Sequence, residues 1–295
     1  MMEKSYKNIA TVFNPPPYHM VGDGFRVHNF FPSQPQIGLQ GMSPFFLMDY
    51  GAKWMVPASE KQKGVGVHPH RGIETVTIAY HGKVAHHDSG GNSGIIGEGD
   101  VQWMTAGGGV LHKEYHEKEF SKKGGLFQMV QLWVNLPAKF KMTPARYQAI
   151  ENPMMGKFIS EDQKCRVDVI AGEYKSVKGP AMMFSPVNLF NASLTAGAKA
   201  DFSFPESYNS GILLIEGEVI VNQSVKAAEN QFIYFGHSGE VITVEAEKDS
   251  ILLVMSGEPL NEPIAPSGPF VMNTQDEIKK AYEDYYKGEF GYLED

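Results

Sequence analysis

Glycine and proline recur along the whole chain and divide it into short apolar runs. The 295 residues include 31 glycines and 18 prolines, and helical periodicity is scarce. Runs such as 101–104 and 250–255 have the length of a β-strand and are bounded by residues that favour turns. The pattern predicts an all-β chain with many turns.

The expected strands share this composition of apolar and β-branched residues between turns. They cover residues 45–48, 72–79, 101–104, 127–136, 182–184, 211–215, 218–221, 231–235, 241–244 and 250–255. One short helix is expected near the C-terminus, where Thr274 and Glu277 have the spacing of a capping box. Ile278, Ala281 and Tyr285 then fall on one face of that helix.

Two stretches repeat the same order of strand, glycine turn and strand. They are residues 73–84 and residues 211–219, and each is followed by a further strand. The repeat predicts two β-barrels in tandem, an N-terminal one over residues 1–145 and a C-terminal one, with the helix, over residues 146–295. The join is expected within 137–168, where prolines and polar residues interrupt the strand pattern.

Composition limits the class of protein. The net charge of −8 and the pI near 5.7 argue against a nucleic-acid surface, which needs clustered positive charge. The single cysteine, Cys165, excludes an intrachain disulfide. No signal peptide is expected, because the first residues lack an apolar run, and no segment approaches the roughly 20 apolar residues that span a bilayer. A cytoplasmic protein with no membrane contact is therefore expected.

Two pairs of metal-binding side chains occur in the first half of the chain. His68 and His70 are separated by one residue, as are His112 and Glu114. Residues two apart share one face of a strand, so each pair directs both side chains the same way. If the two strands are neighbours, three imidazoles and one carboxylate converge on a site that suits iron(II), manganese, nickel, copper or zinc. The second half has only His237, so the metal is expected in the first barrel alone.

Two other residues compete for the fourth ligand position. His116 shares the strand face of His112 and Glu114, and Glu74 shares the parity of His70. Glu74 would lie about 13 Å from His70 along a regular strand, at roughly 3.3 Å per residue, so only a bend would bring it in. Arg71, which follows His70 directly, is expected to face away from the metal.

Several segments resemble the cupin superfamily and, more narrowly, the pirin family. They are residues 68–76, 99–107 and 111–114 in the first half, and residues 257–260 and 268–274 near the C-terminus. The match extends over nearly the whole chain. The resemblance implies two cupin-type jelly-roll barrels, of which only the N-terminal one binds a metal.

The resemblance also implies a ligand set and an activity. In pirins the fourth ligand is the glutamate two residues after the third histidine, which favours Glu114 over Glu74 and gives the set His68, His70, His112 and Glu114. The metal would be mononuclear, with Fe(II) the first choice. Some pirins show quercetin 2,3-dioxygenase activity, and the eukaryotic ones bind transcription regulators.

We therefore expect a dioxygenase that acts on a small aromatic substrate such as a flavonol, with Glu114 as the residue that accepts the substrate proton. A different class of function also fits, namely a metal-containing regulatory protein that binds a protein partner and turns nothing over. A third expectation is isomerisation of a small molecule at the same site, which would consume no oxygen.

Overall fold

The computed structural model describes residues 5–294, and its regular structure is mainly β. The two helices found there are α1 (Lys118–Lys123) and α2 (Gln275–Tyr286), so the all-β prediction is confirmed. The described residues form two compact units. We call residues 17–39, 45–152 and 260–294 the N-terminal barrel, and residues 5–16, 40–44 and 153–259 the C-terminal barrel.

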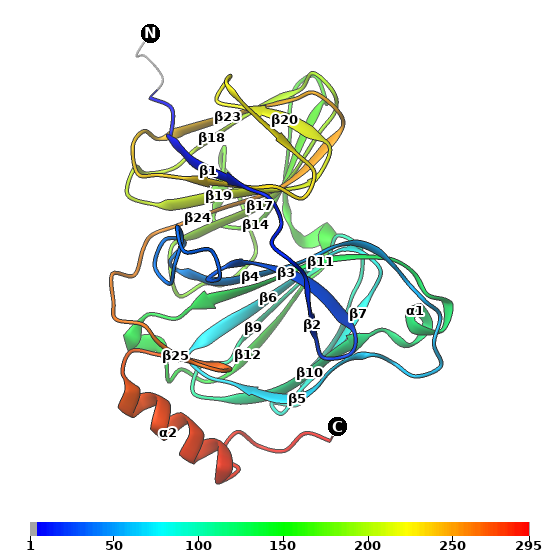
Figure 1. Cartoon of the computed structure of the whole chain (residues 1–295), viewed down its shortest axis with the longest axis vertical. Coiled ribbons are helices and arrows are strands. Elements are labelled where there is room, and N and C mark those ends of the chain that lie inside the picture. Colours follow the sequence, from blue (N-terminus) through cyan, green and yellow to red (C-terminus); the bar gives the residue numbers. More distant parts are fainter. Residues whose placement is uncertain (1–4, 295) are drawn as a thin grey trace. The chain divides into compact units, whose positions relative to one another are not determined.

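The N-terminal barrel consists of a seven-stranded and a four-stranded antiparallel sheet, with a small two-stranded ribbon (Figure 1). The large sheet has the order β12-β9-β6-β11-β4-β3-β2, the small sheet β5-β10-β7-β8, and the ribbon β25-β26. The strands are β2 (His19–Val21), β3 (Phe25–Phe31), β4 (Phe45–Val56), β5 (Gly64–His70), β6 (Ile73–His81), β7 (Val84–Asp88), β8 (Ser93–Ile96), β9 (Val101–Thr105), β10 (Val110–His116), β11 (Gly125–Asn135), β12 (Arg146–Ile150), β25 (Ala265–Ser267) and β26 (Phe270–Met272).

The C-terminal barrel has the same plan. Its large sheet has the order β1-β22-β19-β24-β17-β14-β13, its small sheet β18-β23-β20-β21, and its ribbon β15-β16. The strands are β1 (Ile9–Phe13), β13 (Gly156–Ile159), β14 (Cys165–Ala171), β15 (Glu173–Tyr174), β16 (Val177–Lys178), β17 (Val187–Leu194), β18 (Lys199–Ser203), β19 (Asn209–Glu216), β20 (Glu218–Val221), β21 (Val225–Ala228), β22 (Phe232–Phe235), β23 (Val241–Ala246) and β24 (Ser250–Gly257).

The repeat seen in the sequence corresponds to equivalent pairs of consecutive strands, each of which passes from the large sheet to the small sheet of its barrel. β6 leads through Gly82 into β7, and β19 leads through Gly217 into β20. Both glycines have a positive φ, +82° and +90°, which side chains with a Cβ rarely adopt. β6 is central in its sheet between β9 and β11, and β19 is central between β22 and β24. The tandem pair of jelly-roll barrels is thus confirmed.

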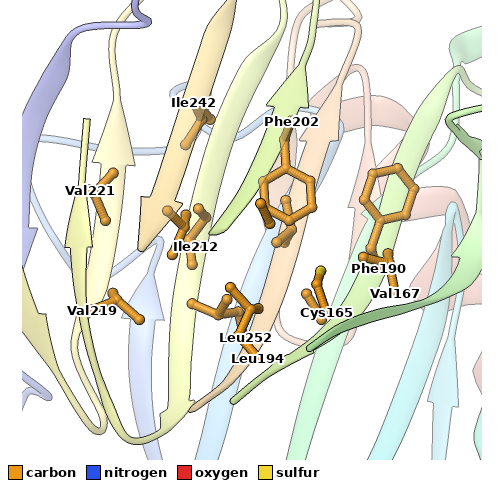
Figure 2. Packing of buried hydrophobic residues seen from close by; sticks show 14 of the residues in the cluster. Cys165, Val167, Phe190, Leu194, Phe202, Ile212, Val219, Val221, Ile242 and Leu252 are labelled. Atoms are coloured by element: carbon orange, nitrogen blue, oxygen red, sulfur yellow. The ribbon is translucent and has the colours of Figure 1, made fainter. Parts of the chain in front are cut away.

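The interior of the C-terminal barrel is apolar. Figure 2 shows Phe190, Phe202, Ile212 and Leu252 pointing toward one another from different strands, and all four are almost completely buried. Cys165 belongs to the same cluster as a buried free thiol. Packing of this kind fills the barrel with side chains and stabilises it through burial of apolar surface.

The ends of the chain correct the predicted division into residues 1–145 and 146–295. β1 pairs with β22 in the C-terminal barrel, whereas the last 35 described residues, 260–294, belong to the N-terminal barrel. Figure 1 shows α2, in red, beside β25, against which it packs. Sequence proximity did not indicate these placements, because the partners that hold each end lie far away along the chain.

Local predictions were mostly accurate. Thr274 is the N-cap of α2 and forms the capping box with Glu277, and the helix buries Ile278 and Ala281. The strand expected at residues 182–184 is wrong, because this segment is irregular between Pro180 and Pro186 and leaves Met182 exposed. α1 was not foreseen, and two 3-10 turns, Ala138–Phe140 and Asn152–Met154, lie near the join. Among residues 5–294 we find no helix with the length and apolarity to span a membrane.

Candidate metal centre

The two ligand pairs lie on neighbouring strands, which is the condition under which the sequence predicted that they converge. β5 pairs antiparallel with β10, and His68 lies directly opposite His112. The ring centroids of the three histidines are separated by 4.9 Å (His68 to His70), 4.3 Å (His68 to His112) and 4.8 Å (His70 to His112). One ring nitrogen of each histidine lies within 4.8 Å of those of the others. This group can hold a metal ion.

The Nδ1 atoms of two of these rings are already engaged. The Nδ1 atom of His68 lies 2.9 Å from the carbonyl oxygen of Gly66, and that of His70 lies 3.0 Å from the carbonyl oxygen of Pro269. A carbonyl only accepts, so both rings carry their proton on Nδ1 and present an unprotonated Nε2. The Nε2 atom of His112 is buried and has no hydrogen-bond partner among the described residues. A buried acceptor without a partner fits a metal ligand.

Burial keeps the imidazoles of His70 and His112 neutral. It lowers the pKa of His70 to about 3, helped by the neighbouring His68, and it places the pKa of His112 well below the usual value. The neutral ring is the form that binds a metal. Near neutral pH, metal binding therefore requires no loss of a proton from His70 or His112.

Glu114 is held in a fixed orientation beside the histidines. A β-bulge separates it from His112 in the pairing with β5. The Oγ1 atom of Thr77 donates to Oε1 of Glu114 at 2.9 Å, and the Nε2 atom of Gln131 lies 3.3 Å from Oε2. The carboxylate is buried, and these two side chains orient it.

A partly open cavity of about 80 Å³ adjoins the cluster. His68, His70 and Glu114 line it, and its other walls are mostly apolar. The remaining lining residues are Val21, Phe25, Val27, Asp49, Val65, Met129, Gln131 and Trp133.

Asp49 is a second carboxyl group on this cavity, and no sequence pattern indicated it. Asn29 donates to its Oδ1 atom at 2.8 Å, and burial raises the pKa of Asp49. Asp49 pairs across strands with Gln131, which contacts Glu114. The cavity therefore has one carboxylate in the metal cluster and another outside it.

His86 was also missed. It forms a second possible metal group with His112 and Glu114, and all three residues are buried. His86 and Asp88 have the same one-residue separation as the two recognised pairs, which is the signal that could have found them.

Neither competing ligand belongs to these two groups. The Thr105 hydroxyl donates to the buried carboxyl of Glu74 at 2.7 Å. His116 does share the inward face of β10, but it is surrounded by Phe25, Phe120 and Phe127. Arg71 is buried in an ion pair with Asp284 of α2, at 2.9 Å.

Glu74 gives a pH-dependent prediction. Burial raises its pKa to about 7, above the ordinary 4.5, so the folded protein keeps a proton that the unfolded chain releases between these values. Stability should therefore fall as pH rises from 4.5 to 7. Glu74→Gln has no proton to lose at this position. Its free energy of unfolding, relative to that of the wild type, should therefore rise by roughly 3 kcal/mol between pH 4.5 and pH 8. Urea unfolding followed by tryptophan fluorescence measures this, and equal pH profiles would contradict it.

Comparison with known proteins reveals relatives along the whole chain. The family profile described as "Pirin" matches residues 24–134, and that described as "Pirin C-terminal cupin domain" matches residues 189–291. A Pseudomonas aeruginosa protein named "Putative quercetin 2,3-dioxygenase" is 42% identical over 284 residues, 96% of this chain and 98% of the relative. Pirin-1 of Arabidopsis thaliana is 36% identical over 76% of this chain and 77% of its own length.

A solved structure agrees with these matches. The crystal structure of a quercetin 2,3-dioxygenase from Acinetobacter baumannii superposes with a TM-score of 0.92 at 46% identity. The superposition covers 98% of this chain and 100% of that one.

Proposed function

Because the chain belongs to the pirin family, we propose that it is a metal-dependent dioxygenase that acts on a flavonol-like or other small hydroxylated aromatic substrate. The observation that carries the proposal is the shared cavity, in which the donor cluster meets an apolar wall. The proposed ligands are His68, His70, His112 and Glu114. Support also comes from the relatives that carry the name quercetin 2,3-dioxygenase.

The donor set suits several divalent metals. Three neutral imidazoles and one carboxylate fit iron(II), manganese, nickel, copper and zinc, and we propose iron(II) for an oxygen-dependent reaction. A metal bound there supplies Lewis acidity that lowers the pKa of a substrate hydroxyl.

The protein's own residues would then orient the substrate and manage its proton. Phe25 and Trp133 offer aromatic surface for a flat ring and exclude water from it. Glu114, held by Thr77 and Gln131, is the proposed acceptor of the hydroxyl proton. Asp49, on the same cavity, is placed to contact a second hydroxyl group of the substrate.

The size of the cavity restricts how a flavonol can bind. About 80 Å³ is well below the roughly 300 Å³ or more of pockets that enclose drug-sized ligands. Only the reacting hydroxylated edge of the flavonol can enter this cavity, unless the wall formed by Val21 and Phe25 moves. The same small volume is the observation that favours the second candidate function, a metal-containing regulatory protein that binds a protein partner.

The test is aerobic incubation of iron-loaded protein with quercetin. We expect its visible absorbance to fall in step with oxygen uptake at an oxygen electrode, and we expect Glu114→Ala to lose most of this activity. A loss of quercetin absorbance that is no faster than with Glu114→Ala would favour the regulatory role. Absorbance loss without oxygen uptake would indicate isomerisation instead.

A further inference from the structure

We propose that His86 is a positioning residue for the metal centre. It accepts a hydrogen bond from Nδ1 of His112 and thereby holds His112 with Nε2 directed at the ligand cluster. The inference rests on the proposed metal site and not on the dioxygenase reaction.

The strand pairing brings the groups together. β7 lies next to β10 with His86 opposite Glu114 and Asp88 opposite His112. The Nδ1 atoms of His86 and His112 are 3.4 Å apart, and Nε2 of His86 lies 3.4 Å from Oδ2 of Asp88. Both separations are longer than the usual range for hydrogen bonds from an N–H group, which ends at about 3.2 Å. The three residues form a chain that runs from the metal cluster to a carboxylate.

The partners fix which nitrogen carries each proton. Asp88 accepts from Nε2 of His86, so His86 has its proton on Nε2 and an unprotonated Nδ1. The Nε2 atom of Gln102 also approaches that Nδ1, at 3.3 Å, as a donor would, so Gln102 and His112 share its single lone pair. His112 must then carry its proton on Nδ1, which leaves its Nε2 lone pair for a metal.

This arrangement completes a pattern in the three proposed histidine ligands. Backbone carbonyls of Gly66 and Pro269 hold the Nδ1 protons of His68 and His70, and for His112 the same role falls to a side chain. Partners of this kind commonly set the orientation of a metal-binding histidine. Of these three hydrogen-bond acceptors, His86 is therefore the one that a side-chain substitution can remove.

The surroundings keep His86 rigid. Its side chain is fully buried and stacks on Tyr147, with ring centroids 5.2 Å apart and planes inclined by 19°. The backbone N–H of Asn92 donates to Asp88 at 3.0 Å, and its side-chain amide donates to the same carboxylate. Because both ring nitrogens of His86 have partners, it positions His112 and does not itself bind the metal.

The experiment measures zinc binding by competition with a chelator. His86→Phe keeps a ring against Tyr147 but removes the acceptor, and we expect it to weaken zinc binding about 10–100-fold. His86→Gln, whose side-chain oxygen can accept from His112, should retain most of the affinity. The matched control is His87→Phe on the same strand, where the ring faces outward and contacts the Tyr115 hydroxyl.

Nitrogen-15 NMR of histidines in the zinc-loaded wild type tests the same inference without a substitution. We expect protons on Nδ1 of His112 and on Nε2 of His86. Unchanged zinc affinity in a folded His86→Phe protein, or the opposite proton placement, would overturn the proposal. Equal losses in His86→Phe and His86→Gln would make His86 a ligand and also overturn it. Zinc binding without any turnover of quercetin would contradict the proposed dioxygenase activity but not the proposed role of His86.

Discussion

Protein carrying His112→Ala is expected to lose more than half of its bound metal. His112 is central to the proposed site, since its ring lies within 5 Å of both His68 and His70 and its buried Nε2 has no other partner among the described residues. Alanine removes one of the three nitrogen donors of the proposed site. Elemental analysis of protein reconstituted with iron(II) or zinc gives the occupancy.

His87→Ala provides the control for this loss. His87 lies one residue from His86 on β7, but its ring is directed toward Tyr115 and it belongs to neither metal group. Occupancy should stay at the wild-type level. Full metal occupancy in both His112→Ala and His70→Ala would refute the four-residue ligand set.

The sequence could predict the ligand pairs because strand geometry is local. Residues two apart share a face in any strand, so the direction of His68 and His70 relative to each other needed no knowledge of the fold. Their convergence with His112 required that β5 and β10 be neighbours, which the family resemblance implied and the pairing confirms.

The surroundings of the site could not be predicted in the same way. Asp49 reaches the cavity from β4, and Pro269, which holds His70, lies 199 residues further along the chain. Such contacts depend on strand order and on the path of the C-terminal segment, which leave no periodic signal. His86 is an intermediate case, because its spacing to Asp88 was visible but its strand was not recognised.

The repeat predicted the two barrels well, but it said nothing about the chain ends. The turns at Gly82 and Gly217 depend on local backbone geometry that the sequence displays directly. The placement of α2 involves long-range contacts instead, among them the burial of its apolar face against the β25-β26 ribbon and an ion pair between Arg71 and Asp284. That pair connects the C-terminal segment to the residue that follows His70.

Asp284→Ala is expected to destabilise the N-terminal barrel by about 3–5 kcal/mol, because it leaves the Arg71 guanidinium buried without its counter-charge. Both side chains are about 5% exposed or less, and Nη1 of Arg71 lies 2.9 Å from Oδ2 of Asp284. Arg71 also donates from Nε to the carbonyl of Gly108 and lies over the Phe290 ring. Tryptophan fluorescence during urea unfolding measures the effect selectively, since all three tryptophans belong to the N-terminal barrel.

Two further variants separate the loss of the ion pair from general damage to α2. Asp276→Ala removes an exposed aspartate from the first turn of the same helix and should leave the unfolding midpoint nearly unchanged. The double variant Arg71→Met with Asp284→Leu removes both charges and should recover much of the lost stability, since an apolar pair needs no counter-charge. A double variant as unstable as Asp284→Ala would show that packing at this position, and not the unpaired charge, sets the stability of the contact between α2 and the strand that carries His70.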